Sequence, residues 1–240
     1  MSDLKINNIT PTLGNIKVGS TNVSEIYCGN TLVWPPATPS IGCNLTDVTI
    51  GTQIWKGCNL NVETYNDNTP IPEVTDPTEW ANLTTGAWCY YNNDPDNGPI
   101  HGKLYNWYAV NDTLHGGLAP TGYHVPSQAE WDTMVSYLGG ALVAGGPMKA
   151  TGTIQAGTGL WESPNEMGTN ESGFAGIPGG QCDTNGVFSS PLTYYGLWWT
   201  SSEINATIAS YNYLRYDTGT VEGSSLNKKM GFSVRLIKNE

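Results

Sequence analysis

The carboxyl-terminal stretch of the chain, residues 194–237, constrains the fold more than any other segment. It opens with the apolar run Gly-Leu-Trp-Trp at 196–199 and closes at 231–237, where apolar residues alternate with Ser233 and Arg235. An alternation of period two predicts a half-buried β-strand. Between these segments lie mainly Tyr, Asn, Ser, Thr and Asp, which combine stiff contact area with adaptable hydrogen bonds. The stretch therefore predicts a rigid frame that carries a binding surface.

Glycine and aromatic residues supply much of the remaining chain. Among 240 residues there are 29 Gly, 9 Trp and 13 Tyr, and charged residues make up 13%. This composition favours short strands and long ordered loops over a helical bundle. The formal net charge of −11 argues against nucleic acid, whose binding depends on Lys and Arg at phosphates, and against an anionic membrane surface. No segment reaches the roughly 20 apolar residues of a membrane span, and we expect no secretory signal.

Residues 1–34 contain a short internal repeat, because 19–23 and 29–33 share the pattern Gly-Ser/Asn-Thr-x-Val. Each copy follows an apolar segment, which predicts strands joined by tight turns. A module of this size buries too little surface to be stable alone, so we expect it to serve attachment or oligomerisation. The alternative is that it forms the first hairpin of the main domain. The proline-rich segment 35–40 predicts a stiff linker, and 41–240 the main domain.

The clearest local signal is a helix that begins after Ser127. Ser127 and Glu130 have the spacing of a capping box, in which each side chain bonds a backbone N–H at the helix start. Apolar residues follow at i, i+3, i+4 and i+7, from Trp131 to Leu138, and two glycines end the helix. We expect this apolar face to pack into the core.

Weaker patterns predict the other elements of an α+β domain with two helices. The polar, proline-rich residues 61–80 indicate a surface loop. The remaining predicted elements are a hairpin over 48–55 that turns at Gly51, a strand over 88–91, a second helix over 103–111, and short buried strands over 174–178 and 186–188.

Candidate metal ligands lie in the segment 92–98. Asp94 and Asp96, with the amide side chains around them, offer oxygen ligands for Ca²⁺. Their spacing departs from the twelve-residue calcium loop, and an Asx-turn explains the same residues. Calcium is therefore kept as an alternative, and we predict no other cofactor.

Catalytic motifs are missing from the sequence. The three histidines stand in no HExxH arrangement, and there is no GxSxG motif, P-loop or dinucleotide fingerprint. His124 and Arg235 are expected to have structural hydrogen-bonding roles. The five cysteines are scattered, so one bridge such as Cys43–Cys58 and buried free thiols both remain open. We predict that the chain is not an enzyme.

Six short motifs follow one another in order along residues 43–238. They are Gly-Thr-Gln-Ile-Trp at 51–55, Gly-Lys-Leu-Tyr-Asn-Trp at 102–107, Gly-Tyr-His-Val-Pro-Ser at 122–127, Phe-Ala-Gly-Ile-Pro-Gly-Gly at 174–180, Trp-Trp-Thr-Ser-Ser-Glu at 198–203 and Gly-Phe-Ser-Val-Arg at 231–235. The ordered set resembles the Fibrobacter succinogenes major paralogous domain. That resemblance implies a C-type-lectin-like fold similar to formylglycine-generating enzymes. Those enzymes use a cysteine pair near the carboxyl end, whereas residues 191–240 contain no cysteine. The resemblance therefore implies the fold and not that activity.

The same resemblance implies a ligand-binding region, since some members are diversified by retroelements between the Trp-Trp strand and the terminal strand. In this chain the region runs from Glu203 to Asn227, with two tyrosines just ahead of it. The polar, amphipathic residues there agree with that assignment, although a solvated loop without a ligand is the alternative. The predicted ligand-contacting residues are Tyr194, Tyr195, Glu203, Asn205, Asn212, Tyr216, Asp217, Thr220, Glu222 and Asn227.

The function that fits these features best is recognition of a bacterial surface glycan or protein. The repeat in residues 1–34 resembles short repeats of phage virion and tail proteins. We therefore expect a tail or head fibre or decoration protein on the virion surface, made in the host cytoplasm. It would assemble with virion structural proteins through residues 1–34, as a homo-oligomer. The alternatives are a bacterial surface adhesin of the same family, a purely structural decoration protein, and an enzyme related to the formylglycine-generating enzymes.

Overall fold

The computed structural model describes residues 17–18, 21–22, 26–28, 31–34 and 46–239. The chain divides into two units, Met1–Ile41 and Gly42–Glu240. Among the described residues, no helix has both the length and the apolar character that crossing a membrane requires.

Within its described residues, the first unit contains two pairs of antiparallel strands. Strand β1 (Lys17–Val18) pairs with β2 (Thr21–Asn22), and β3 (Ile26–Cys28) pairs with β4 (Thr31–Trp34). The two pairs coincide with the two copies of the sequence repeat, as expected from alternating strand and turn signals.

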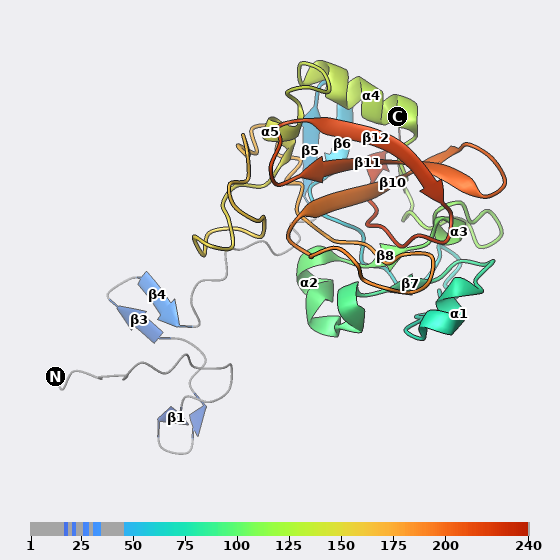
Figure 1. The fold of residues 1–240 in the computed structure, drawn as a ribbon, viewed down its shortest axis with the longest axis horizontal. Helices are drawn as coiled ribbons and strands as arrows, with labels where there is room; N and C mark the ends of the chain where they lie inside the picture. The colour runs from blue at the N-terminus through green and yellow to red at the C-terminus, as the bar shows by residue number, and fades with distance from the viewer. Residues whose placement is uncertain (1–16, 19–20, 23–25, 29–30, 35–45, 240) are drawn as a thin grey trace. The chain divides into compact units, whose positions relative to one another are not determined.

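A three-stranded antiparallel sheet forms the centre of the second unit (Figure 1). Its strands are β10 (Tyr195–Glu203), β11 (Ile208–Arg215) and β12 (Val221–Asn227), in that order. Successive side chains of a strand point to opposite faces of the sheet. The adjacent tryptophans Trp198 and Trp199 therefore leave β10 in opposite directions, and each enters a different hydrophobic cluster.

The two clusters cover the two faces of this sheet. Trp199 packs on one face against Phe232, with ring centroids 4.5 Å apart. On the other face Trp198 meets Phe174 at 5.6 Å and Trp131 at 6.1 Å. Each of these five aromatic residues is 0% exposed. Burial of aromatic surface on both sides fixes the sheet in the middle of the domain.

Helix α4 (Gln128–Tyr137) covers the Trp198 face of the sheet, and Figure 1 shows it lying alongside the strands. The Ser127 side chain accepts from the Glu130 N–H, and the Glu130 carboxylate accepts from the Ser127 N–H, which confirms the predicted capping box. Trp131 and Met134 are fully buried, and Leu138 is only partly buried at the helix end. Beyond it, Gly139 adopts a φ of +99°, which favours glycine and ends the helix.

Smaller elements surround this centre and confirm an α+β fold, but five short α-helices replace the two that were predicted within the described residues. The predicted hairpin over 48–55 is confirmed as β5 and β6. A four-stranded sheet has the order β5 (Asp47–Ile50), β6 (Gln53–Lys56), β13 (Ile237–Lys238) and β9 (Tyr123–His124), and β7 (Trp88–Cys89) pairs with β8 (Leu104–Tyr105). The remaining helices are α1 (Pro77–Ala81), α2 (Gly98–His101), α3 (Trp107–Val110), α5 (Gly145–Met148) and the 3₁₀ turns η1 (Tyr91–Asn93) and η2 (Pro95–Asn97).

Several local predictions are wrong in extent. The helix predicted over 103–111 begins only at Trp107, because the Asn106 side chain accepts from the Ala109 N–H and caps α3 there. The predicted surface loop over 61–80 contains the start of α1, which Asp76 caps in the same way. The segments 174–178 and 186–188 form no strand, and 174–178 joins other backbone only through an isolated bridge between Lys149 and Gly176.

The terminal segment 231–237 is buried on both sides, so the prediction of a half-buried strand is wrong. Ser233 is 1% exposed and Arg235 is 0% exposed. Arg235 donates to the carbonyl oxygens of Lys56 (3.1 Å) and Phe174 (2.5 Å), and its guanidinium lies 4.3 Å from the Phe174 ring centroid. The predicted structural role of Arg235 is thereby confirmed, with backbone carbonyls as partners.

We predict that replacing Met134 by alanine lowers the free energy of unfolding by about 2–5 kcal/mol, because the substitution leaves a cavity under α4. Thr133→Ala, one residue earlier on the exposed side of the same helix, should change it by less than about 0.5 kcal/mol. Chemical denaturation of both variants measures the difference. Equal losses would show that the α4 face does not pack as described.

Candidate functional site

The predicted ligand residues occupy two separate ends of the central sheet. Tyr195 lies opposite Arg215 at one end, and Ile208 lies opposite Asn227 at the other. Strand β11 has 8 residues, so these ends are roughly 23 Å apart at about 3.3 Å per residue. Tyr194, Tyr195, Tyr216, Asp217, Thr220 and Glu222 belong to the first end, Glu203, Asn205 and Asn227 to the second, and Asn212 to the middle.

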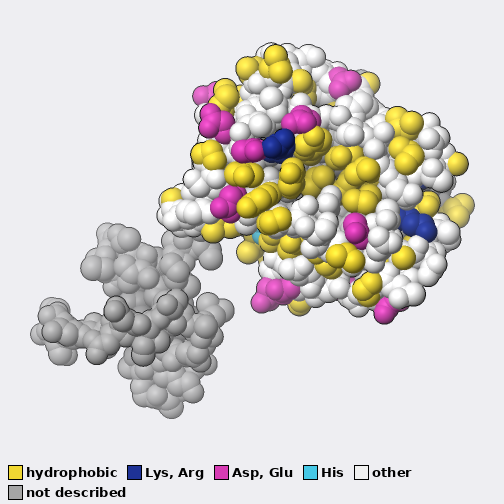
Figure 2. Space-filling view, in the orientation of Figure 1, with side chains coloured by type: hydrophobic (Ala, Val, Ile, Leu, Met, Phe, Trp, Pro, Cys, Tyr) yellow, Lys and Arg dark blue, Asp and Glu magenta, His cyan; other side chains and the backbone are white. Residues whose placement is uncertain are grey.

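Four partly exposed tyrosines lie in two pairs at the first end and are together called the tyrosine patch here: Tyr194, Tyr195, Tyr213 and Tyr216. The rings of Tyr194 and Tyr216 are 4.7 Å apart, and those of Tyr195 and Tyr213 are 6.5 Å apart. In Figure 2 hydrophobic side chains, with tyrosine counted among them, form a band over the sheet beside a basic side chain and several acidic ones. The patch therefore presents aromatic surface next to charge.

Polar side chains surround the tyrosine patch and bond to one another. Arg215 donates two hydrogen bonds to the carboxylate of Asp217, at 3.0 and 2.7 Å. The Tyr213 hydroxyl donates to Glu222, and burial together with this carboxylate raises the pKa of Tyr213 to about 12. The tyrosine therefore keeps its proton at neutral pH. Two-point pairing of Arg215 also fixes the direction of its side chain.

Lys149, directly after α5, holds the backbone beneath this end of the sheet. Its side chain is 0% exposed, and the ammonium donates to the carbonyl oxygens of Glu166 (2.6 Å), Arg215 (3.0 Å) and Thr218 (2.7 Å). Burial lowers the pKa of Lys149 to about 8. One cation thus ties the turn between β11 and β12 to a separate loop.

Asn212 does not belong to the exposed surface. It is 3% exposed, and its amide exchanges two hydrogen bonds with the side-chain amide of Gln128 in α4, at 3.2 and 3.1 Å. Because it alternates with Tyr211 and Tyr213 along β11, it faces the helix. The structure assigns Asn212 to the contact between sheet and helix.

Sequence reasoning missed two residues of this site, Tyr213 and Arg215. They lie on the same face of β11 as Tyr211, whereas Asn212 lies on the other. In a strand, every second residue points to the same face. Applied to Tyr-Asn-Tyr-Leu-Arg, this rule would have separated the two tyrosines and the arginine from the asparagine. The prediction instead treats residues 203–227 as one ligand-binding region between two strands.

The second end of the sheet uses its polar side chains mainly to shape turns. The Asn205 side-chain oxygen Oδ1 accepts from the backbone N–H groups of Thr207 (2.9 Å) and Ile208 (3.0 Å). Asn227 accepts from the Lys229 N–H at 3.0 Å, and Glu203 pairs with the buried ammonium of Lys228. These contacts give Glu203, Asn205 and Asn227 structural roles. They leave fewer free hydrogen-bonding groups for a ligand at this end.

The candidate metal ligands lie in a turn. The Asp94 carboxylate accepts from the Asp96 N–H at 3.0 Å and begins η2, as an Asx-turn does. No group of three or more His, Cys, Asp or Glu side chains within the described residues is arranged to hold a metal ion.

The cysteines and His124 have structural surroundings. Cys58 is disulfide-bonded, which corrects the alternative of free thiols at this position, and Cys43 lies outside the described residues. Cys89 and Cys182 are buried free thiols, and burial, reinforced by Cys182, raises the pKa of Cys89. His124 contacts Glu130 through Nε2 and Asn239 through Nδ1, both at 2.7 Å.

These features define an α+β domain whose central sheet carries an aromatic and polar surface at one end. The chain belongs to the Fibrobacter succinogenes major domain family, whose model matches residues 48–238. The match includes the central sheet, Lys149 and all ten predicted ligand residues. No curated protein and no solved structure shows significant similarity to the chain.

We predict that Lys149→Met lowers the free energy of unfolding by about 2–4 kcal/mol, because three carbonyl oxygens lose their donor. Amide hydrogen exchange should also accelerate in the turn over 216–220. The matched control is Lys238→Met, at an exposed lysine, where a change below about 0.5 kcal/mol is expected. Unchanged exchange in the turn would mean that Lys149 does not hold this end of the sheet.

Proposed function

We propose that this protein is a non-catalytic ligand-binding protein that recognises a bacterial surface glycan or protein through the tyrosine patch. The observation that carries this function is the fixed arrangement of the patch, in which the Arg215–Asp217 pair orients charge and Lys149 holds the backbone below. Tyrosine gives large contact area at low cost in conformational entropy. A surface already held in place loses less entropy when it binds.

We further propose that the second unit has a C-type-lectin-like fold, related to that of the formylglycine-generating enzymes. Its short antiparallel sheets, its long ordered loops and its two aromatic clusters around one central sheet support this assignment. In such an arrangement the loops and the sheet end bind the ligand, while the buried clusters stabilise the fold.

The surroundings of the side chains that could act as a nucleophile or a base support the non-catalytic assignment. A thiolate nucleophile needs a lowered pKa, whereas burial raises that of Cys89. Ser127, Glu130 and His124 lie close together, but the Glu130 carboxylate accepts from Ser127 to cap α4. Turnover of peptide cysteines or polysaccharides by the purified protein, lost on Cys182→Ala, would establish the enzyme alternative instead.

The setting that we propose is the surface of a phage virion, as a fibre or decoration protein, with a bacterial adhesin as the alternative. The first unit would join the protein to itself and to virion structural proteins. Its support is the sequence repeat, which coincides with two short antiparallel strand pairs. Strand pairs of this size need packing partners for stability.

For the ligand site, we predict that the double variant Tyr194→Ala and Tyr216→Ala weakens binding to bacterial cells by about tenfold or more, as expected for central aromatic residues. Its free energy of unfolding should change by less than about 1 kcal/mol. Binding of labelled protein to a panel of bacterial strains and to a glycan array measures the effect. Glu203→Gln, at the other end of the sheet, is the control. Loss of binding in the control alone would place the site there.

For assembly, we predict that a fragment starting at residue 42 folds but does not form the oligomer of the full chain. Analytical ultracentrifugation of the fragment and of the full chain compares their masses. An oligomer that persists in the fragment would assign assembly to the second unit.

A further inference from the structure

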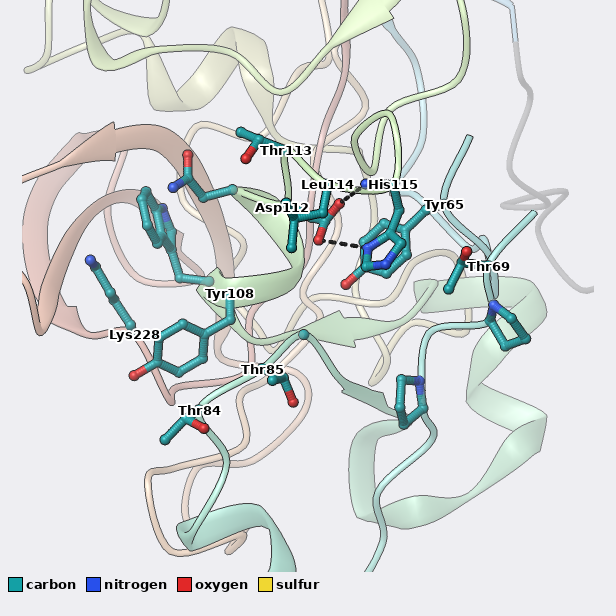
Figure 3. A pocket seen from close by; sticks show the side chains of 15 residues that line it. Tyr65, Thr69, Thr84, Thr85, Tyr108, Asp112, Thr113, Leu114, His115 and Lys228 are labelled. Atoms are coloured by element: carbon teal, nitrogen blue, oxygen red, sulfur yellow. Dashed lines mark hydrogen bonds and ion pairs between the residues drawn. The ribbon is translucent and has the colours of Figure 1, made fainter. Parts of the chain in front are cut away.

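A second candidate site is a hollow of about 430 Å³ beside α3, shown in Figure 3. Its volume lies within the about 300–1,000 Å³ typical of small-molecule sites. It is lined by α3 and the segment after it, by residues from 65–72 and 84–86, and by Lys228. No residue of the tyrosine patch lines it among those the structure describes.

The hydroxyl of Tyr65 is an unused hydrogen-bonding group in this hollow. Tyr65 is only 6% exposed, yet within the described part of the chain its hydroxyl has no hydrogen-bond partner. Figure 3 shows this hydroxyl directed toward the middle of the hollow. The hydroxyl oxygen keeps contact with solvent because it faces the hollow. A ligand atom there can replace water as its hydrogen-bond partner.

Two neighbours keep this hydroxyl in place and available. A Cβ atom at Gly86 would lie 2.0 Å from the Tyr65 hydroxyl, so only glycine leaves room for it there. The ring of His115 stacks on the Tyr65 ring at 5.1 Å and an angle of 21°. Burial, with the charge of Asp112 nearby, raises the pKa of Tyr65 to about 12, so the hydroxyl remains a donor at neutral pH.

The charged groups around the hollow are already paired. Asp112 accepts from the His115 N–H at 2.8 Å, and its second oxygen lies 2.9 Å from His115 Nδ1 (Figure 3). Lys228 pairs with Glu203 and lies 4.5 Å from the Trp107 ring centroid. A charged ligand would have to break one of these pairs, and a neutral ligand would not.

The remaining lining groups are neutral and both donate and accept hydrogen bonds. They include Thr69, Thr84, Thr85, Thr113 and the amide of Asn111. Hydroxyl groups of this kind match the hydroxyl groups of a sugar, which also donate and accept. Tyr108 is partly buried on the side of the hollow opposite Tyr65 (Figure 3) and adds an aromatic surface for apolar C–H groups.

We propose that this hollow binds a neutral saccharide unit, with hydroxyl groups bonded to Tyr65 and the threonines and with C–H groups on Tyr108. The ligand class follows from an unpaired donor, neutral hydroxyls, an aromatic wall and compensated charges. The site is independent of the tyrosine patch, so either site can fail a test without the other.

The full ¹⁵N-labelled chain is titrated with methyl glycosides of glucose, galactose, mannose and N-acetylglucosamine, and with glucuronate and glucosamine as charged probes. At least one neutral glycoside should shift the amide signals of residues 84–86 and 108–115. The charged probes should bind more weakly than the neutral ones. Tyr65→Phe removes only the hydroxyl and should weaken binding roughly five- to tenfold, the value of one hydrogen bond.

Matched variants separate binding from folding. Tyr65→Phe should leave the melting temperature unchanged or slightly higher, because the lost hydroxyl has no protein partner. Tyr105→Phe is the control: its hydroxyl donates to the Val62 carbonyl at 2.7 Å, so that variant should lose stability and keep glycoside binding. Tyr108→Ala should also weaken binding from the opposite wall, which gives an independent result if Tyr65→Phe fails to fold.

Three results would overturn the saccharide site. They are the absence of shifts for every neutral glycoside, equal affinity in wild type, Tyr65→Phe and Tyr108→Ala, and preferential binding of a charged probe. Shifts confined to the tyrosine patch would assign sugar binding to that surface instead. The Tyr194→Ala and Tyr216→Ala double variant should bind glycosides in the hollow as the wild type does.

Discussion

The packing of two adjacent tryptophans on opposite faces of one strand is the interaction on which the rest of the structure depends. Trp198 and Trp199 are both 0% exposed, and each indole N–H finds a buried acceptor, Asn59 Oδ1 at 2.8 Å and the Tyr105 carbonyl at 2.9 Å. A sheet with two buried faces cannot slip by one residue without exchanging the clusters. This constraint fixes the register of β10 and β11, and with it the positions of all side chains at the sheet ends.

Two buried cations then secure segments that have little regular secondary structure. Arg235, in the terminal segment, donates hydrogen bonds to backbone carbonyl oxygens. Lys149 donates to three more beneath the turn between β11 and β12. A domain with few long helices or strands leaves many backbone carbonyls without ladder partners. Lysine and arginine, which carry several donors each, satisfy such groups in clusters. The polar interior is therefore part of what makes the tyrosine patch rigid.

This architecture separates the buried core from the proposed binding surface. The aromatic clusters and buried cations lie within the domain, while the tyrosine patch lies at one end of the central sheet. The hollow beside α3 is lined by other segments, and among its lining residues Lys228 directly follows β12. Substitution at an exposed sheet end costs little stability when the frame below is independent of it.

The sequence by itself determined the features that depend on neighbours a few positions apart: the α+β class, the capping box at Ser127, the hairpin at Gly51 and the motifs of the family. Tertiary structure decided what depends on distant segments. Ser233 and Arg235 alternate with apolar residues, and that pattern alone indicated that they face solvent. Both are buried, because other segments cover both sides of the chain there. Tertiary structure also turned Asn212 toward α4 and assembled a hollow from residues 65 to 228. Local patterns report which side chains share a face, but only packing decides what that face meets.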